Sequence, residues 1–295
     1  MAIVVEKIQD LKNVTPMMQQ YLEVKSQYMD YILMYRLGDF FEMFYEDAVT
    51  ASRELELTLT GRDCGEGYRA AMCGVPFHKS DIYIGRLVEK GYKVAVCEQT
   101  EDPSAAKGLV KREVVRVVTP GTVTDGAMLT ESENNFLCAV YYTPTAVGVG
   151  FADISTGQIF ATCIEGERIG ERVINEIGVY TPRELIMNVD KNSCSHICDF
   201  VADRLSCVIT DKRADLFDGE SSCERARATF GDDECSKGNE ISICAVGALI
   251  GYIELTQMTH TSFVKTLNIL YKSSSLESSI KRKTDCRACR RNVLK

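Results

Sequence analysis

The spacing of hydrophobic and polar positions near the start of the chain predicts a helix followed by a β-hairpin. Thr15 precedes Pro16 and the helix-forming run MMQQYLEVKSQY, and a hydroxyl before a first-turn proline is typical of a helix start. YILMYRL has the aliphatic and aromatic content of a buried strand, and FFEMF alternates as a second strand. Because Gly38 and Asp39 between them are turn residues, the two strands are expected to form a hairpin.

Strands and helices keep alternating up to about residue 125. The predicted elements are a helix over 45–56, a strand over 69–76, a helix over 80–91 and a strand over 92–99. Ser80 is expected to cap the second of these helices and Gly91 to end it. This order predicts an α/β domain with a mixed sheet, and Pro120 with Gly121 marks its end.

A second unit is predicted over 126–270. Segment 134–165 indicates two or three strands of an antiparallel meander, and segment 170–187 a helix and a strand. The apolar run 241–257 predicts a helix that closes this second core, after a polar, acidic stretch over 211–240. Beyond residue 270 the chain has too few apolar residues for a third core.

Composition and charge narrow the class of protein. The chain has 295 residues of which 45% are hydrophobic, enough for two buried cores, and no apolar run long enough for a membrane span. The charged N-terminus is unlike a signal peptide, so the cytoplasm is the expected location. A net charge of −8 argues against a protein that simply coats nucleic acid.

The charge is unevenly distributed along the chain. Lys and Arg number 15 against 19 Asp and Glu in residues 1–125, and 11 against 21 in residues 126–270. In residues 271–295 they number 8 against 2. The middle of the chain is therefore acidic and its tail basic.

The 13 cysteines are interpreted as reduced thiols, because they are scattered through a long chain without a signal peptide. Two groups approach metal-ligand spacing, namely Cys286 with Cys289, and Cys194 with His196 and Cys198. Neither has a second pair at zinc-finger distance, so chance spacing is the preferred account and no metal site is predicted.

The segment GDFFEMFYEDA places a carboxylate in a strand of aromatic residues. Phe40, Glu42 and Phe44 are expected to share one face of the strand, with Phe41 on the other. A buried, unpaired carboxylate costs several kcal/mol, so Glu42 must lie in solvent, pair with a cation or await a donor on a ligand. The simplest interpretation is a solvated side chain at a strand edge.

A second interpretation is recognition of weakened DNA. An apolar ring can insert at a base step from the minor groove and kink the duplex, and mispaired bases resist this less. A neighbouring carboxylate is repelled by phosphates, and that repulsion is offset where a displaced base donates a hydrogen bond to it. On this interpretation Phe40 inserts and Glu42 discriminates.

Several sequence blocks resemble one family. TPMMQQYLEVK, GDFFEMFYEDA, LTLTGRD, MCGVPFHK and VAVCEQTEDPSAAKGLVKREVVRVVTPGT together are similar to the N-terminal part of the bacterial DNA mismatch-repair MutS family. The match runs from Thr15 to Thr124 almost without interruption. Its separate blocks make it far more specific than the Phe-x-Glu motif alone.

The resemblance implies a domain assignment. Residues 1–125 would be the mismatch-recognition domain, domain I, and 126–270 the connector domain, domain II, with a ribonuclease-H-like fold. Residues 271–295 would be a basic tail or the start of the next domain. In the family's Phe-x-Glu motif the Phe stacks on a mispaired base and the Glu hydrogen-bonds to it, which carries over to Phe40 and Glu42. Phe41 is expected to pack in the protein.

The resemblance also implies partners and cofactors. The family recognises mismatches and small insertion or deletion loops in double-stranded DNA, binds MutL through the connector, forms homodimers and uses ATP with Mg²⁺. The ATPase's phosphate-binding loop, G-x-x-x-x-G-K-[ST], is absent from this sequence. This stretch is therefore expected to bind no cofactor and not to act as an enzyme.

Weaker candidates remain. The segment Gly74 to His78 resembles a family signature, although it also fits a plain strand-to-helix turn, and nothing around His78 argues for a switch. Five basic residues are candidate phosphate contacts, although each also fits a solvated charge: Arg62, Lys79, Lys107, Lys111 and Arg112. Asp153 on an early strand raises the alternative of a metal-dependent nuclease, which needs several converging carboxylates. The other acidic residues do not occupy strand centres, which disfavours that alternative.

Overall fold

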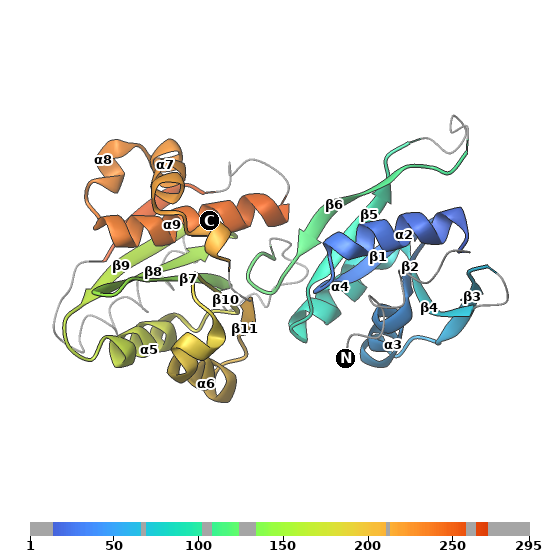
Figure 1. Ribbon diagram of the computed structural model, residues 1–295, viewed down its shortest axis with the longest axis horizontal. Helices are drawn as coiled ribbons and strands as arrows, with labels where there is room; N and C mark the ends of the chain where they lie inside the picture. The colour runs from blue at the N-terminus through green and yellow to red at the C-terminus, as the bar shows by residue number, and fades with distance from the viewer. Residues whose placement is uncertain are drawn as a thin grey trace, which may run out of the picture. The chain divides into compact units, whose positions relative to one another are not determined.

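The computed structural model describes residues 14–65, 69–101, 108–123, 134–210, 213–257 and 264–270. Contacts divide the chain into two compact units, Met1–Thr119 and Pro120–Lys295 (Figure 1). Each unit holds one six-stranded mixed sheet with helices packed against it. The predicted α/β class with mixed sheets is confirmed. The predicted tail over 271–295 lies outside the described residues.

The sheet of unit 1 has the strand order β3-β4-β2-β1-β5-β6. Its strands are β1 (Ile32–Leu37), β2 (Phe40–Phe44), β3 (Thr60–Asp63), β4 (Arg69–Pro76), β5 (Val94–Gln99) and β6 (Arg112–Val118). β1 and β5 are parallel, and the other neighbours are antiparallel. The predicted hairpin of β1 and β2 is confirmed, with Gly38 at φ 59° in its turn, where a glycine is favoured.

Among the residues that the structure describes, three α-helices cover this sheet: α2 (Pro16–Gln27), α3 (Tyr45–Leu55) and α4 (Ser80–Glu89). Met18, Tyr21 and Leu22 of α2 pack in one core cluster with Phe44 and Leu33. α3 and α4 contact each other and strand β4. A short 3-10 helix, η1 (Phe77–Lys79), joins β4 to α4.

The sheet of unit 2 has the order β11-β10-β7-β8-β9-β12. Its strands are β7 (Phe136–Tyr142), β8 (Ala146–Asp153), β9 (Gln158–Glu165), β10 (Glu184–Met187), β11 (Val208–Thr210) and β12 (Thr266–Ile269). β7, β8 and β9 form the predicted antiparallel meander, while β10 and β11 continue in parallel beside β7. A meander extended in this way from its first strand is the ribonuclease-H-like arrangement.

Helices cover both faces of this second sheet (Figure 1). α5 (Ile169–Tyr180) and α6 (Ser195–Arg204) supply one core cluster, with the 3-10 turn η3 (Lys191–Cys194). The other cluster contains α7 (Gly219–Phe230), α8 (Asp232–Cys235), α9 (Glu240–Gln257) and the turn η4 (Ala214–Leu216). The apolar helix predicted to close this core is α9.

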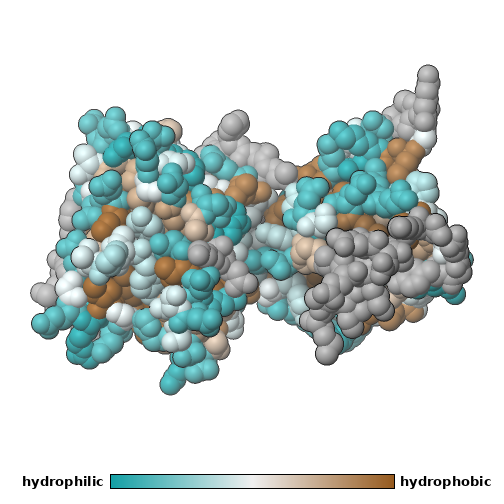
Figure 2. Space-filling model, in the orientation of Figure 1, coloured by the Kyte–Doolittle hydropathy of each residue, from teal (hydrophilic) through white to brown (hydrophobic). Residues whose placement is uncertain are grey.

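Helix α9 is the one described helix that is long and apolar enough to cross a membrane, but 72% of it is buried inside the unit. Burial of that kind is expected of a core helix. On the face shown in Figure 2, hydrophobic residues lie in small groups among hydrophilic ones.

Helix α2 begins at Pro16 directly after Thr15, as predicted, although the Thr15 side chain makes no capping hydrogen bond. The predicted cap at Ser80 is wrong, because Ser80 is already the first residue of α4 and Lys79 precedes the helix without a side-chain capping bond. The stretch over 211–240, read only as polar and acidic, holds α7 and α8. Its apolar positions are too few to show a helical period, and packing against α9 orders it instead.

Candidate nucleic-acid interface

Phe40 is the most exposed residue of strand β2, whose other residues are buried or, in the case of Glu42, partly buried. It begins β2, lies opposite Leu37 of β1 and Pro76 of β4, and is 47% exposed. Phe41, the next residue, is 2% exposed, which confirms the prediction that it packs in the protein. Because successive side chains of a strand point to opposite faces, the Phe41 ring lies in the core and the Phe40 ring lies in solvent.

The backbone that carries the exposed Phe40 ring is held in place by hydrogen bonds. β2 is paired on both sides, and the backbone N–H of Phe77 donates to the carbonyl of Asp39 at 3.0 Å, which ties the exit of β4 to the hairpin turn. Farther along the same face, Phe44 is fully buried under Tyr21 of α2, with ring centroids 4.9 Å apart. An apolar group on such a support can be pushed into a ligand without deforming its own strand.

Glu42 is paired with a cation. Arg62 of β3 donates from Nη1 to Oε2 of Glu42, and their side chains are 37% and 15% exposed. The sequence allowed Glu42 to lie in solvent, to pair with a cation or to await a donor on a ligand, and in the structure it pairs with a cation. Gly74 lies opposite Glu42 on β4, and a Cβ there would sit 3.4 Å from Cγ of Glu42. The glycine therefore leaves space beside the carboxylate.

A second exposed ring lies near the same end of the sheet. Phe77 is 39% exposed, and the Arg36 guanidinium carbon lies 3.7 Å from its centroid. Arg36 also donates to the Gly38 carbonyl at 2.5 Å and to Glu98 at 3.3 Å. The sequence pattern predicted no role for the Phe77 ring or for Arg36. The signal for Phe77 is an aromatic residue directly after Pro76, where the strand has ended.

The basic residues that were candidate phosphate contacts lie in different environments. Arg112 was wrongly placed among possible phosphate contacts, because it is buried and donates to the Arg36 carbonyl at 2.7 Å and to Gln20 at 3.0 Å. Lys111 pairs with Glu113 at 2.7 Å, and Lys79 is exposed in η1. Lys107 lies outside the described residues. Among the four basic candidates that the structure describes, Arg62 is the one that contacts the Phe-x-Glu motif.

In unit 2, the Asp153 side chain stabilises the turn that follows strand β8. It is buried at the end of β8, and its Oδ1 accepts from the backbone N–H and the hydroxyl of Ser155, at 3.0 and 2.6 Å. Within the described ranges no group of three or more His, Cys, Asp or Glu is placed to hold a metal ion. Cys194 and Cys198 have sulfurs 4.0 Å apart beside an exposed His196, and Cys286 and Cys289 lie outside the described residues.

Family comparison assigns both units. The family model MutS domain I matches residues 15–127, and MutS domain II matches residues 135–265. The chain belongs to the MutS family. Unit 1, with Phe40 and Glu42, corresponds to MutS domain I, and the ribonuclease-H-like unit 2 to MutS domain II.

Relatives named DNA mismatch repair protein MutS align over most of the chain. The protein from Acetivibrio thermocellus is 46% identical over 260 residues, which are 88% of this chain and 30% of the relative. That from Ruminiclostridium cellulolyticum is 48% identical over 256 residues, 86% of this chain and 29% of the relative. That from Desulforamulus reducens is 57% identical over 177 residues, 60% of this chain and 20% of the relative. The chain spans about 30% of the length of the first two MutS relatives.

Proposed function

We propose that this chain recognises base mismatches and small insertion or deletion loops in double-stranded DNA, as the recognition part of a mismatch-repair protein. The observation that carries the proposal is the exposed Phe40 ring beside the Glu42 carboxylate, at the end of a rigid strand in a MutS domain I. The names of the relatives place the family in DNA mismatch repair.

The ring of Phe40 acts as a wedge. Inserted from the minor groove, an aromatic side chain unstacks one base step at a cost of a few kcal/mol and kinks the duplex there. A mispaired or unpaired base has already lost part of its stacking and pairing, so the cost of insertion is lower at that site. Phe40 therefore finds local weakness in the duplex and reads no base sequence.

Glu42 supplies discrimination. Near the phosphate backbone its carboxylate is repelled, and a normally paired base offers it no donor in exchange. A displaced, mispaired base has a free N–H group, and a charge-assisted hydrogen bond from it offsets the repulsion. The pair of residues thus binds mispairs by attraction and disfavours matched DNA by repulsion.

The remaining assignments concern the longer protein. Domain II is proposed to bind MutL, and its acidic balance of 11 basic to 21 acidic residues over 126–270 suits a protein partner better than DNA. Homodimerisation and use of ATP with Mg²⁺ are proposed for the longer MutS protein, with neither a cofactor nor an enzymatic activity in this stretch. A cytoplasmic location is part of the same proposal.

Fluorescence anisotropy tests the proposal. A short labelled duplex with one G·T mispair and its matched twin are titrated with the wild-type chain, Phe40→Ala and Ile82→Ala at one salt concentration. Ile82 is a matched control, because it is an exposed apolar residue on α4. Wild type and the control should prefer the mispair, and Phe40→Ala should lose that preference. Equal affinity of the folded wild-type chain for both duplexes would contradict the proposal.

A further inference from the structure

The ion pair between Glu42 and Arg62 joins two strands that are not neighbours. β4 lies between β3, which carries Arg62, and β2, which carries Glu42. Arg62 therefore reaches past the intervening strand to place its guanidinium on the carboxylate. Gly74, opposite Glu42, presents no side chain in the way.

The contact uses one side of the carboxylate. Nη1 of Arg62 reaches Oε2 of Glu42, and among the residues that the structure describes no hydrogen bond reaches Oε1. An ionised carboxylate has about four lone-pair sites over its two oxygens, so Oε1 remains able to accept from a further donor. A base and Arg62 can therefore engage Glu42 together.

We propose that Arg62 is a specificity-determining residue that sets how strongly Glu42 discriminates, an inference that rests on the proposed function. Its guanidinium compensates the Glu42 charge, which reduces the repulsion between this site and the phosphates of any duplex. Its contact with Oε2 leaves Oε1 available to a displaced base. Arg62 thereby reduces the penalty that Glu42 places on matched DNA.

The proposal predicts an asymmetric effect of Arg62→Gln. Without the guanidinium, Glu42 repels every duplex more strongly, and only a mispaired base offsets part of this increase, because its hydrogen bond to the uncompensated carboxylate becomes stronger. Matched-duplex affinity should fall more than mismatch affinity, so the ratio of the two should rise about two- to fivefold, the range typical of partly exposed ion pairs. Arg62→Lys keeps the charge and should restore the wild-type ratio.

A double-mutant cycle separates this role from a plain phosphate contact. In a Glu42→Gln background, Arg62→Gln should leave the ratio unchanged, because no carboxylate is left to compensate. Arg69→Gln is the matched control, since Arg69 lies on the same β3-β4 hairpin and pairs with Asp63 instead. If Arg62→Gln weakens both duplexes equally in both backgrounds, with a smaller salt dependence of binding, Arg62 is a phosphate contact and the proposal is wrong.

A measurement without DNA tests the ion pair by itself. In the ¹⁵N-labelled chain, the guanidinium N–H signals of Arg62 should shift on Glu42→Gln and remain in place on Asp63→Asn. Signals that do not shift on Glu42→Gln would overturn the proposal, whatever the chain does with mismatches. Shifted signals in a chain that binds both duplexes equally would instead overturn the proposed function and leave the ion pair in place.

Discussion

At the scale of the residue, Phe40 and Glu42 are neighbours on one strand face, and the proposed function gives them opposite effects on DNA binding. On the proposed function, Phe40 favours any step into which it can insert, and Glu42 penalises steps that offer no donor. Both proposed effects depend on position, because Phe40 is exposed at the strand end and the Glu42 side chain is mostly covered beside Arg62. Substitutions at the two positions should therefore differ in kind.

Glu42→Ala should raise affinity for matched DNA while lowering mismatch preference. The substitution removes repulsion from phosphates together with the acceptor for the displaced base. Competition binding of matched and G·T duplexes at fixed salt measures both changes. A fall in matched-duplex affinity would contradict the assigned role of the carboxylate.

The sequence predicted that Phe40 and Phe41 lie on opposite faces of their strand, but it did not predict that Arg62 pairs with Glu42. Alternation along five residues of one strand separates Phe40 from Phe41, so a local pattern contains the answer. The partner of Glu42 lies 20 positions away on a strand that the sequence analysis did not predict, and it reaches Glu42 across a third strand. Long-range pairing of this kind depends on sheet order, which no local pattern encodes.

At the scale of the element, buried and surface polar contacts hold the helices of unit 1. The C-terminal part of α2 is joined to α3 by Lys25 and Asp47, whose side chains are 9% and 11% exposed and whose closest atoms are 2.8 Å apart. Asp47 also accepts from the backbone N–H of Leu33 at 3.0 Å. Burial raises the pKa of the Asp47 carboxyl, and the Lys25 charge opposes that rise.

Lys25→Met should destabilise unit 1 by about 3 to 5 kcal/mol, because it leaves the Asp47 carboxyl buried without its cation. The double variant Lys25→Met with Asp47→Leu should lose less than the single variant, since no charge then remains buried. Urea unfolding followed by tyrosine fluorescence compares them. A double variant less stable than the single one would contradict this account.

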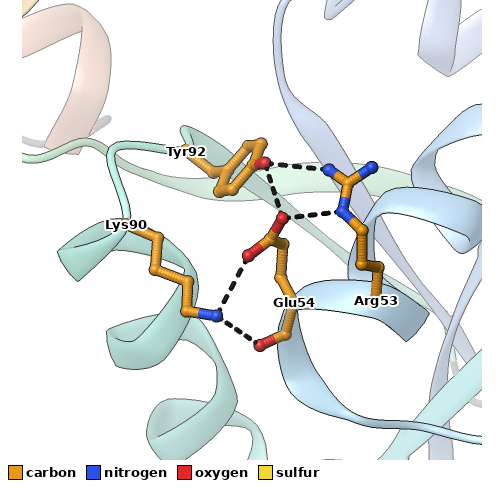
Figure 3. Close-up of polar contacts among 4 residues, drawn as sticks. All are labelled: Arg53, Glu54, Lys90 and Tyr92. Atoms are coloured by element: carbon orange, nitrogen blue, oxygen red, sulfur yellow. Dashed lines mark hydrogen bonds and ion pairs between the residues drawn. The ribbon is translucent and has the colours of Figure 1, made fainter.

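The C-terminal ends of α3 and α4 meet in a surface cluster around Glu54 (Figure 3). Lys90 donates to the Glu54 carboxylate at 3.0 Å, Arg53 at 2.9 Å, and the Tyr92 hydroxyl at 3.1 Å. These hydrogen bonds lower the pKa of Glu54 from its ordinary 4.5 to about 2. Because the folded-state pKa is depressed, the associated stability is present above pH 4.5 and is lost as the pH falls toward 2.

Glu54→Gln should therefore destabilise the chain near neutral pH and have no effect near pH 2. The expected change is a gap between the urea midpoints of variant and wild type that closes as the pH falls. Glu89→Gln, at an exposed position of α4, is the matched control. A gap of constant size across this pH range would show that the cluster does not hold Glu54 ionised.

Helices α7 and α9 of unit 2 pack with their backbones in contact. A Cβ on Gly247 of α9 would lie 1.8 Å from the Ser222 carbonyl oxygen of α7. The glycine is therefore required by packing, because its φ is not in the left-handed region. This close approach explains how the polar segment of α7 is held in place.

Gly247→Ala should destabilise unit 2 by roughly 1 to 3 kcal/mol, the usual cost of overpacking. Gly178→Ala in α5 is the control, because its Cβ would meet only Phe200, at 3.4 Å. That substitution should be neutral or stabilising, since alanine favours a helix over glycine by about 0.5 to 1 kcal/mol. Thermal unfolding distinguishes the two, and equal midpoints for both variants would contradict the packing argument.

At the scale of the whole molecule, the two compact units differ in the surface features that they carry. Unit 1 carries an exposed aromatic ring at the start of a strand, and residues 126–270, which make up most of unit 2, carry the more acidic balance of charge. Alternating elements and the Pro120-Gly121 punctuation were enough to predict two α/β units. The helices within 195–230 escaped prediction because their polar sequences become helical through packing in unit 2.

The most direct test of the central claim is unstacking at the mispair. A duplex with 2-aminopurine next to a G·T mispair brightens when that base loses its stacking partner. Wild type and Ile82→Ala should increase the fluorescence on binding, whereas Phe40→Ala should leave it unchanged under conditions where it is fully bound. An equal increase with Phe40→Ala at saturation would show that Phe40 does not insert, and would contradict the account.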